Sequence, residues 1–195
     1  MSRFTLSVSL ILAPIVLLAG FLIAGEASGA SAPELRPPPG KPESQSPLAA
    51  GPPGKLPRAI LETDRGSITL ELFPDVAPKT VARFIELSKK GFYNGLTFRV
   101  VPRFLIQTGD PLGDGTGGSG QSLPAEFNEK NHGLGTVGMA RKHEPDSADS
   151  QFYICLESQP FLDGNYTVFG QVSEGLEILP KIQERDIVRK VTVKP

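Results

Sequence analysis

The fold is decided by the stretch Thr97-Phe98-Arg99-Val100-Val101-Pro102-Arg103-Phe104-Leu105-Ile106-Gln107-Thr108-Gly109-Asp110. Apolar runs on either side of a proline are typical of short strands joined by a turn. The stretch therefore predicts two strands, near Thr97–Val101 and Phe104–Thr108. A Gly-rich loop follows from Gly109 to Gly120 and is predicted to be a long turn.

The same pattern of short strands extends on both sides of this stretch. Ala59–Thr63 and Ser67–Leu72 alternate apolar and polar residues around Asp64-Arg65-Gly66. This alternation predicts a β-hairpin at the start of the folded region. Later strands are predicted at Gly135–Ala140, Gln151–Leu156, Tyr166–Val172 and Ile187–Val193.

Two helices are predicted among these strands. Pro78 suits the first turn of a helix that ends near Gly91, after two lysines. A second helix is predicted from Ser173 through Ile182, bent or shortened by Pro180. Many short strands with few helices predict a mainly β fold, a closed antiparallel β-barrel of about eight strands capped by two α-helices.

The N-terminal residues are typical of an export segment. Arg3 is the one charged residue of Met1–Gly25, and 22 uncharged residues follow it. A cleaved signal peptide ending near Ala30-Ser31-Ala32 fits this pattern, and so does a membrane anchor of about 20 apolar residues. Residues 1–32 are thus predicted to be a signal peptide or a signal-anchor. Either segment leaves the rest of the chain outside the cytoplasm, in a periplasmic, secreted or membrane-anchored form.

A proline-rich linker is predicted at residues 33–57. Nine of these 25 residues are proline, and large apolar side chains are almost absent. Such a segment cannot bury enough apolar surface to offset the entropy of ordering it, so we expect an extended spacer. The folded domain is predicted to span residues 58–195.

Charge and cysteine content exclude several classes of function. The formal net charge is -1, and no cluster of basic residues marks a nucleic-acid surface. Cys155 is the only cysteine, so no intrachain disulfide forms. With His132 and His143 as the only histidines, too few soft ligands remain for a zinc site.

Several sequence blocks resemble the cyclophilins, a family of peptidyl-prolyl cis-trans isomerases. The stretch 97–110 is similar to their pattern F-H-R-V-[VI]-P-x-F-x-x-Q-G-G-D. Asp149–Cys155 resembles N-G-S-Q-F-F-I, and Phe161–Gly170 resembles W-L-D-G-x-[HY]-x-V-F-G. These blocks occur in family order across residues 59–193, so the resemblance covers the whole domain.

The resemblance implies a catalyst that breaks no bond. Rotation about an X-Pro bond has a barrier of about 18–20 kcal/mol from amide resonance. Lowering it needs an apolar seat for the proline ring and a donor that favours the twisted prolyl nitrogen, without nucleophile, metal or cofactor. The resemblance implies that Arg99 is this donor and that Gln107 orients it as the second catalytic residue. It further implies a substrate-binding set of Phe104, Leu105, Tyr153 and Leu162 in the proline pocket, Phe161 and Tyr166 at its rim, and Ala140, Arg141 and Gln151 along the preceding residue.

This chain departs from the family pattern beside Arg99. The usual histidine between the phenylalanine and the arginine is missing, so Phe98 directly precedes Arg99. We expect the loop Asn94-Gly95-Leu96 to absorb the deletion, with Arg99 facing outward. A strand slip by one residue would instead turn Arg99 into the barrel and abolish activity.

Other departures concern single side chains. Tyr153 replaces a phenylalanine, so its hydroxyl needs a partner. Phe161 replaces a tryptophan, which implies a weaker fit for cyclosporin-like peptides. Arg141 replaces an asparagine, and its charge favours acidic substrates.

Several alternatives stay open or are disfavoured. A Cys-His hydrolase would need an exposed Cys155, but this residue lies in an apolar strand pattern. Glu144, Asp146 and Asp149 could bind calcium weakly, although a solvated acidic loop is the simpler interpretation. The remaining rivals are a cyclophilin-like module that binds proline peptides without turnover and a structural domain of an envelope complex. The expected partners are unfolded or extended X-Pro polypeptides, and no nucleic acid is expected. Contact with a membrane is expected only through an uncleaved N-terminal segment. The chain is expected to be a monomer.

Overall fold

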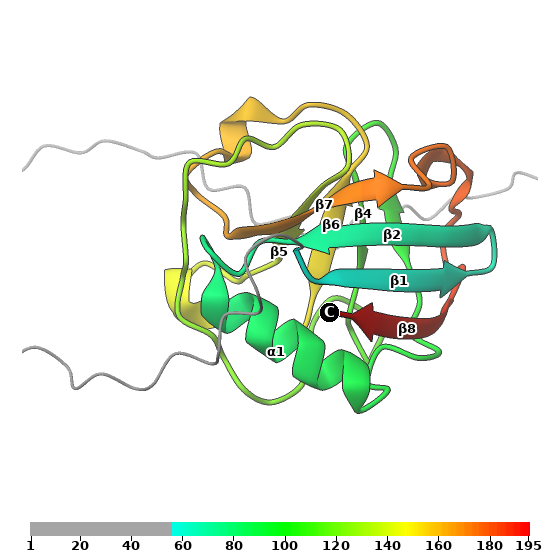
Figure 1. The fold of residues 1–195 in the computed structure, drawn as a ribbon, viewed down its shortest axis with the longest axis horizontal. Coiled ribbons are helices and arrows are strands. Elements are labelled where there is room, and N and C mark those ends of the chain that lie inside the picture. Colours follow the sequence, from blue (N-terminus) through cyan, green and yellow to red (C-terminus); the bar gives the residue numbers. More distant parts are fainter. Residues whose placement is uncertain (1–55) are drawn as a thin grey trace, which may run out of the picture. The chain divides into compact units, whose positions relative to one another are not determined.

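A computed structural model describes residues 56–195 of the chain. These residues form one antiparallel sheet with the strand order β3-β4-β6-β5-β7-β2-β1-β8, which curls into a half-barrel (Figure 1). The predicted export segment and linker, residues 1–32 and 33–57, lie outside the described residues except for the last two of the linker. The eight strands are β1 (Arg58–Thr63), β2 (Gly66–Leu72), β3 (Arg99–Val101), β4 (Leu105–Thr108), β5 (Thr136–Met139), β6 (Phe152–Cys155), β7 (Val168–Glu174) and β8 (Val188–Lys194).

The prediction of the strands from sequence is confirmed. Each strand lies within its predicted range or passes it by at most two residues. The opening hairpin pairs Leu61 with Ile68 and Ala59 with Leu70, and all four side chains are fully buried. Alternation of apolar and polar residues thus places one face of the hairpin against the core.

The predicted first helix is α1, Pro78–Lys89. Its first turn has no side-chain cap of its own. Instead, the carboxylate of Glu126 accepts hydrogen bonds from the amides of Lys79 (3.0 Å) and Thr80 (2.8 Å), which satisfies donors that a helix start leaves unpaired. Phe84 faces the sheet, and its ring lies 5.3–5.4 Å from the rings of Tyr93, Phe152 and Phe169.

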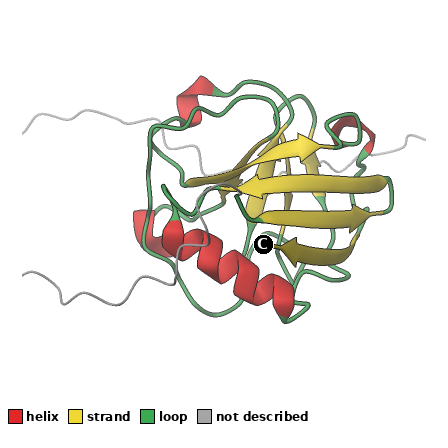
Figure 2. Cartoon of the chain, viewed as in Figure 1, coloured by secondary structure: helices red, strands yellow, loops and turns green. Residues whose placement is uncertain are grey.

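The prediction of a second α-helix from Ser173 through Ile182 is wrong. Strand β7 continues to Glu174, and Gly175 then turns the chain with φ 87°, a conformation that glycine adopts without strain. Only a 3₁₀ turn, Leu179–Lys181, follows, because Pro180 has no amide hydrogen to continue a helix. Figure 2 shows α1 and the short helical turns around the strands.

Closure of the barrel is not confirmed. The strand order ends at β3 and β8, and these two edges do not pair with each other as strands. The segments that precede them do meet, through a bridge between Thr97 and Ile187. The sheet is therefore a curled half-barrel whose edges approach each other just before β3 and β8.

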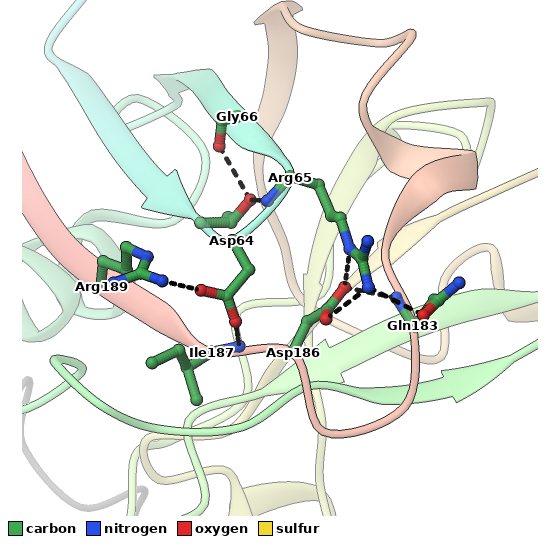
Figure 3. A network of polar contacts seen from close by, with 8 residues as sticks. Asp64, Arg65, Gly66, Gln183, Asp186, Ile187 and Arg189 are labelled. Atoms are coloured by element: carbon green, nitrogen blue, oxygen red, sulfur yellow. Dashed lines mark hydrogen bonds and ion pairs between the residues drawn. The ribbon is translucent and has the colours of Figure 1, made fainter.

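A polar network joins the β1–β2 turn to the loop that precedes β8 (Figure 3). Arg65 donates from Nε to Asp186 Oδ2 (2.7 Å) and from Nη2 to Asp186 Oδ1 (3.0 Å) and Gln183 Oε1 (2.7 Å). Asp64 accepts from the amide of Ile187 (2.9 Å) and pairs with Arg189 (2.6 Å). The turn and the loop are thus held together by charge-assisted hydrogen bonds, which are stronger than neutral ones.

The Arg65–Asp186 pair predicts a pH-dependent stability. The hydrogen bond from Arg65 holds the pKa of Asp186 below its ordinary value of 3.8. A lowered carboxyl pKa contributes stability above pH 3.8, and this contribution is lost as the pH falls through the lowered pKa. Arg65→Met should therefore lower the melting temperature at pH 7, and the difference from the unchanged protein should shrink towards pH 2.

Thermal unfolding followed by circular dichroism tests this expectation. Arg58→Met is the control, because the Arg58 side chain is as exposed as that of Arg65 (both 37%) but lies 3.9 and 3.7 Å from its carboxylate partners. A smaller effect is expected for this variant at pH 7. An Arg65→Met difference that stays constant from pH 7 to pH 2 would contradict the assignment.

Candidate active site

The outer face of β3, β4 and β6 brings the sequence-predicted residues together. The register pairs Arg99 with Gln107, and Gln107 with Tyr153. Directly opposed residues of antiparallel strands project to the same face, so the three side chains form one row. The alternate residues Ile106 and Ile154 point to the other face and belong to the main core.

A small apolar cluster lies beside this row, separate from the main core. Its buried members are Leu105, Tyr153, Cys155 and Leu162. Partly buried side chains pack around them, namely Val101, Phe104, Ala140 and Tyr166. Six of the nine residues predicted to bind substrate therefore belong to one apolar surface on the outer face of the sheet.

Phe161 forms an exposed edge of this surface. It is 61% exposed and stacks on Phe104, with ring centroids 5.7 Å apart. The 3₁₀ turn Pro160–Leu162 presents Phe161 to solvent and buries the neighbouring Leu162. The two stacked rings give the surface a flat apolar rim.

The missing residue before Arg99 does not turn this side chain inward. Phe98 is 1% exposed and belongs to the main core, whereas the next residue, Arg99, is exposed. In the preceding loop, the amide of Gly95 donates to the carbonyl of Val188 (2.7 Å), and the amide of Val188 donates to the carbonyl of Leu96 (2.8 Å). The slipped alternative, with Arg99 inside the barrel, is not observed.

Gln107 does not contact Arg99 through a hydrogen bond, although the two are register partners. Its Nε2 donates to Gln151 Oε1 (2.7 Å). Gln151 in turn donates to the carbonyls of Gly117 (2.7 Å) and Gly115 (3.1 Å). The two glutamines therefore connect the outer face of the sheet to the Gly-rich loop.

Two aspartates hold the same loop in place. Asp110 accepts from the amides of Leu112 (2.9 Å) and Gly115 (2.5 Å). Asp149 accepts from the amides of Ser119 (3.0 Å) and Gly120 (2.9 Å). The backbone amides engage Asp149, one of the three residues of the calcium alternative, and that alternative stays untested.

The hydroxyl of Tyr153 is bonded to His132, a residue that the sequence did not assign to the site. Tyr153 Oη lies 2.9 Å from His132 Nε2, and His132 Nδ1 lies 2.8 Å from Asp163 Oδ1. Burial raises the pKa of Tyr153 well above its ordinary value, so the hydroxyl stays protonated at neutral pH. The carboxylate of Asp163 can only accept, so Nδ1 donates to it, and this hydrogen bond lowers the pKa of Asp163. The sequence indicated that the hydroxyl of Tyr153 needs a partner, because a phenylalanine is usual at this position. It did not indicate that the partner is His132.

Cys155 belongs to the buried part of the small apolar cluster and has no nucleophilic character. Its side chain is fully buried, and burial raises its pKa to about 12. The thiol therefore stays protonated at neutral pH, and thiols in this form are poor nucleophiles. This geometry excludes the Cys-His hydrolase.

Arg141 connects the two loops at the side of the apolar surface. Its guanidinium lies 4.7 Å from the centre of the Tyr166 ring and donates to the carbonyl of Asn165 (3.0 and 3.1 Å). It also donates to the carbonyls of Lys142 (3.0 Å) and His143 (2.9 Å). These contacts engage the guanidinium with backbone, so its predicted preference for acidic substrates stays a prediction.

The outer face of the curled sheet thus has an exposed arginine in the same row as a partly open apolar cluster, an arrangement suited to binding a peptide segment with an apolar side group. Residues 58–195 match the family model described as cyclophilin type peptidyl-prolyl cis-trans isomerase/CLD. The chain belongs to this family and is a peptidyl-prolyl cis-trans isomerase.

The match extends over nearly the full length of two curated relatives that are named for this activity. The peptidyl-prolyl cis-trans isomerase of Synechococcus elongatus is 46% identical over 139 residues, which are 70% of this chain and 95% of the relative. Peptidyl-prolyl cis-trans isomerase B of Bacillus subtilis is 44% identical over 138 residues, 69% of this chain and 96% of the relative.

Solved structures show the same fold. A cyclophilin type peptidyl-prolyl cis-trans isomerase of Cryptosporidium parvum is 29% identical, with a TM-score of 0.67 over 71% of this chain and 97% of that one. A second structure of that protein, obtained in the presence of the dipeptide Ala-Pro, gives a TM-score of 0.66.

Gly138 is required by the ring of Tyr153. A Cβ atom at this position would lie 2.5 Å from Tyr153 Cζ and 2.8 Å from Cε2. Gly138→Ala should therefore displace Tyr153 from its place in the apolar cluster, lower the free energy of unfolding by about 1–3 kcal/mol and weaken peptide binding. Urea unfolding and peptide titration measure these effects.

Gly133→Ala is the matched control, because the nearest atom to its Cβ would lie 3.9 Å away. We expect this variant to bind peptide like the unchanged protein. Equal behaviour of the two alanine variants would show that Tyr153 is not confined by Gly138.

The bond between Tyr153 and His132 predicts a specific coupling. His132→Leu leaves the buried Tyr153 hydroxyl without its hydrogen-bond partner, at a cost of about 1–3 kcal/mol in the free energy of unfolding. Tyr153→Phe removes the hydroxyl, so the double variant should recover part of this loss. Urea unfolding of the two single variants and the double variant measures the coupling, and strictly additive losses would argue against it.

Proposed function

We propose that Arg99 accelerates X-Pro isomerisation by donating a hydrogen bond to the prolyl nitrogen while the proline ring sits in the slot of Leu105, Tyr153 and Leu162. The lone pair of that nitrogen becomes an acceptor only when rotation breaks amide conjugation, so the bond favours the twisted state over the planar ground states. The guanidinium stays charged at every working pH. Lowering the barrier by about 7 kcal/mol gives about five orders of magnitude in rate.

One observation carries this proposal. Within residues 56–195, the exposed guanidinium of Arg99 takes part in no ion pair and no intramolecular side-chain hydrogen bond. Most other arginines of the same region, such as Arg65 and Arg141, are engaged by neighbouring carboxylates or carbonyls, and Arg185 is the other exception. Arg99 is thus available to a ligand, at the end of the row that also contains Gln107 and Tyr153.

We further propose that the enzyme works outside the cytoplasm on exported polypeptides. The apolar residues 4–25 and the proline-rich residues 33–57 support an export segment followed by a spacer. Within the described residues 56–195, no helix is long and apolar enough to cross a membrane.

The rival function is a module that binds proline peptides without turnover. The residue missing before Arg99 suggested it, because a displaced arginine would leave only the apolar slot. The outward side chain of Arg99 beside that slot favours the enzyme instead.

Arg99→Ala tests the catalytic role. We expect kcat/KM for a proline-containing peptide to fall about 10²-fold or more, since a donor used in the transition state is removed. Binding of an Ala-Pro peptide should change little, because the apolar slot is intact. Proline-limited refolding and a peptide isomerisation assay measure the rate, and calorimetry measures the binding.

Arg58→Ala is the control, a partly exposed arginine on β1 that lies near Glu71 and Glu174 rather than near the site. Full activity of Arg99→Ala would overturn the mechanism. Peptide binding without any rate acceleration in the unchanged protein would favour the binding module.

Location is tested separately. Sequencing the N-terminus of the mature protein distinguishes a cleaved signal peptide from a retained anchor. Cells are treated so that any outer barrier is opened while the cytoplasmic membrane stays intact. Protease added to these cells should digest the domain if it lies outside the cytoplasm. Protection of the domain until the cytoplasmic membrane is broken would overturn the proposal.

A further inference from the structure

The strand that contains Arg99 is short and lies at the edge of the sheet. Strand β3 has three residues and pairs with β4 on one side only. Edge strands of this length are weakly held, because half of their backbone groups lack a strand partner. The position of Arg99 therefore depends on what covers the outer edge of β3.

The loop Gln183–Ile187 covers that edge. The amide of Phe98 donates to the carbonyl of Asp186 (2.8 Å), and the carbonyl of Phe98 accepts from the amide of Arg185 (2.9 Å). On the other side of Arg99, the amide of Val100 donates to the carboxylate of Glu184 (2.7 Å). Both neighbours of Arg99 are thus bound to one loop, while Arg99 itself pairs with Gln107 of β4.

The loop holds a backbone conformation that few residues adopt. Arg185 has φ 68°, in the left-handed region that disfavours side chains with a Cβ atom. The amide of the same residue is the donor to the carbonyl of Phe98. Strained residues persist only where the surrounding structure fixes them.

The network of Figure 3 supplies that fixation. Arg65 binds both oxygens of Asp186, Asp186 accepts from the amide of Gln183 (2.8 Å), and Asp64 accepts from the amide of Ile187. The loop is therefore held at both ends by the β1–β2 turn. Asp186 is 9% exposed and the Arg65 side chain is 37% exposed, so these bonds are only partly shielded from water.

We propose that Glu184 and the pair Arg65–Asp186 are positioning residues for Arg99. Glu184 holds the β3 backbone directly, and Arg65 holds it through the loop. Displacing a catalytic group by about 1 Å can cost up to about 10²-fold in rate, so a loosened edge strand lowers turnover even with the slot intact. This inference rests on the proposed catalytic role of Arg99.

The experiment compares Glu184→Ala, Glu184→Gln and Arg65→Met in the purified protein. Glu184→Ala removes the acceptor for the Val100 amide, whereas Glu184→Gln keeps an oxygen at the same reach. We expect Glu184→Ala and Arg65→Met to lower kcat about tenfold, with KM for an Ala-Pro peptide nearly unchanged and Glu184→Gln close to normal. All rates are measured at low temperature, with circular dichroism confirming that each variant is folded.

Controls separate positioning from general destabilisation. Glu177→Ala removes another exposed glutamate, and Arg58→Met removes an equally exposed arginine at the far end of β1; both should keep full activity. If Glu184→Ala fails to fold, Glu184→Asp replaces it, since the shorter side chain retracts the acceptor. NMR relaxation of the Arg99 Nε–H group should report increased motion in the low-kcat variants.

The outcomes distinguish this inference from the function it rests on. Normal kcat in Glu184→Ala and Arg65→Met, together with an inactive Arg99→Ala, would overturn the positioning role and leave the mechanism standing. Full activity of Arg99→Ala would overturn the mechanism and the positioning role together. Loss of activity in Glu184→Gln equal to that in Glu184→Ala would assign the effect to charge and overturn the hydrogen-bonded clamp.

Discussion

The antiparallel register of β3, β4 and β6 determines which side chains face outward, because successive residues of a strand point to opposite faces. With Arg99 opposite Gln107 and Gln107 opposite Tyr153, the three side chains form one row on the outer face. The intervening residues Ile106 and Ile154 enter the core. A shift of one residue would exchange the two sets, so core packing and the site are maintained by the same register.

This arrangement explains why the sheet has two separate apolar clusters. The larger one fills the concave side, where α1 covers it and Phe84 packs among three other aromatic rings. The smaller one, around Leu105 and Leu162, lies on the opposite face and remains partly open to solvent. An apolar surface left open beside an available guanidinium is suited to a small apolar ring with a polar backbone attached, which describes proline in a peptide.

Side chains rather than strands complete the regions around the site. Gln151 holds the Gly-rich loop, Arg141 joins two loops by their carbonyls, and Glu184 binds the open edge of β3. Each of these bonds joins a side chain to backbone that no strand partner satisfies, which is the general requirement for polar groups removed from water. A half-barrel with two open edges depends on such bonds more than a closed barrel would.

The sequence by itself determined the strands, the first helix and six members of the smaller apolar cluster, because period-two alternation and ordered motif blocks are local signals. It failed for the second helix, where Gly175 and Pro180 ended a pattern that looked helical, and for closure of the barrel, which no local pattern encodes. Only the tertiary structure decided that Arg99 faces outward despite the missing residue, that Tyr153 bonds to His132, and that Glu184 holds β3. The contacts of Tyr153 and Glu184 join residues 21 and 84 positions apart, and sequence spacing does not specify which distant groups will meet. The orientation of Arg99 depends on a loop that compensates for the missing residue.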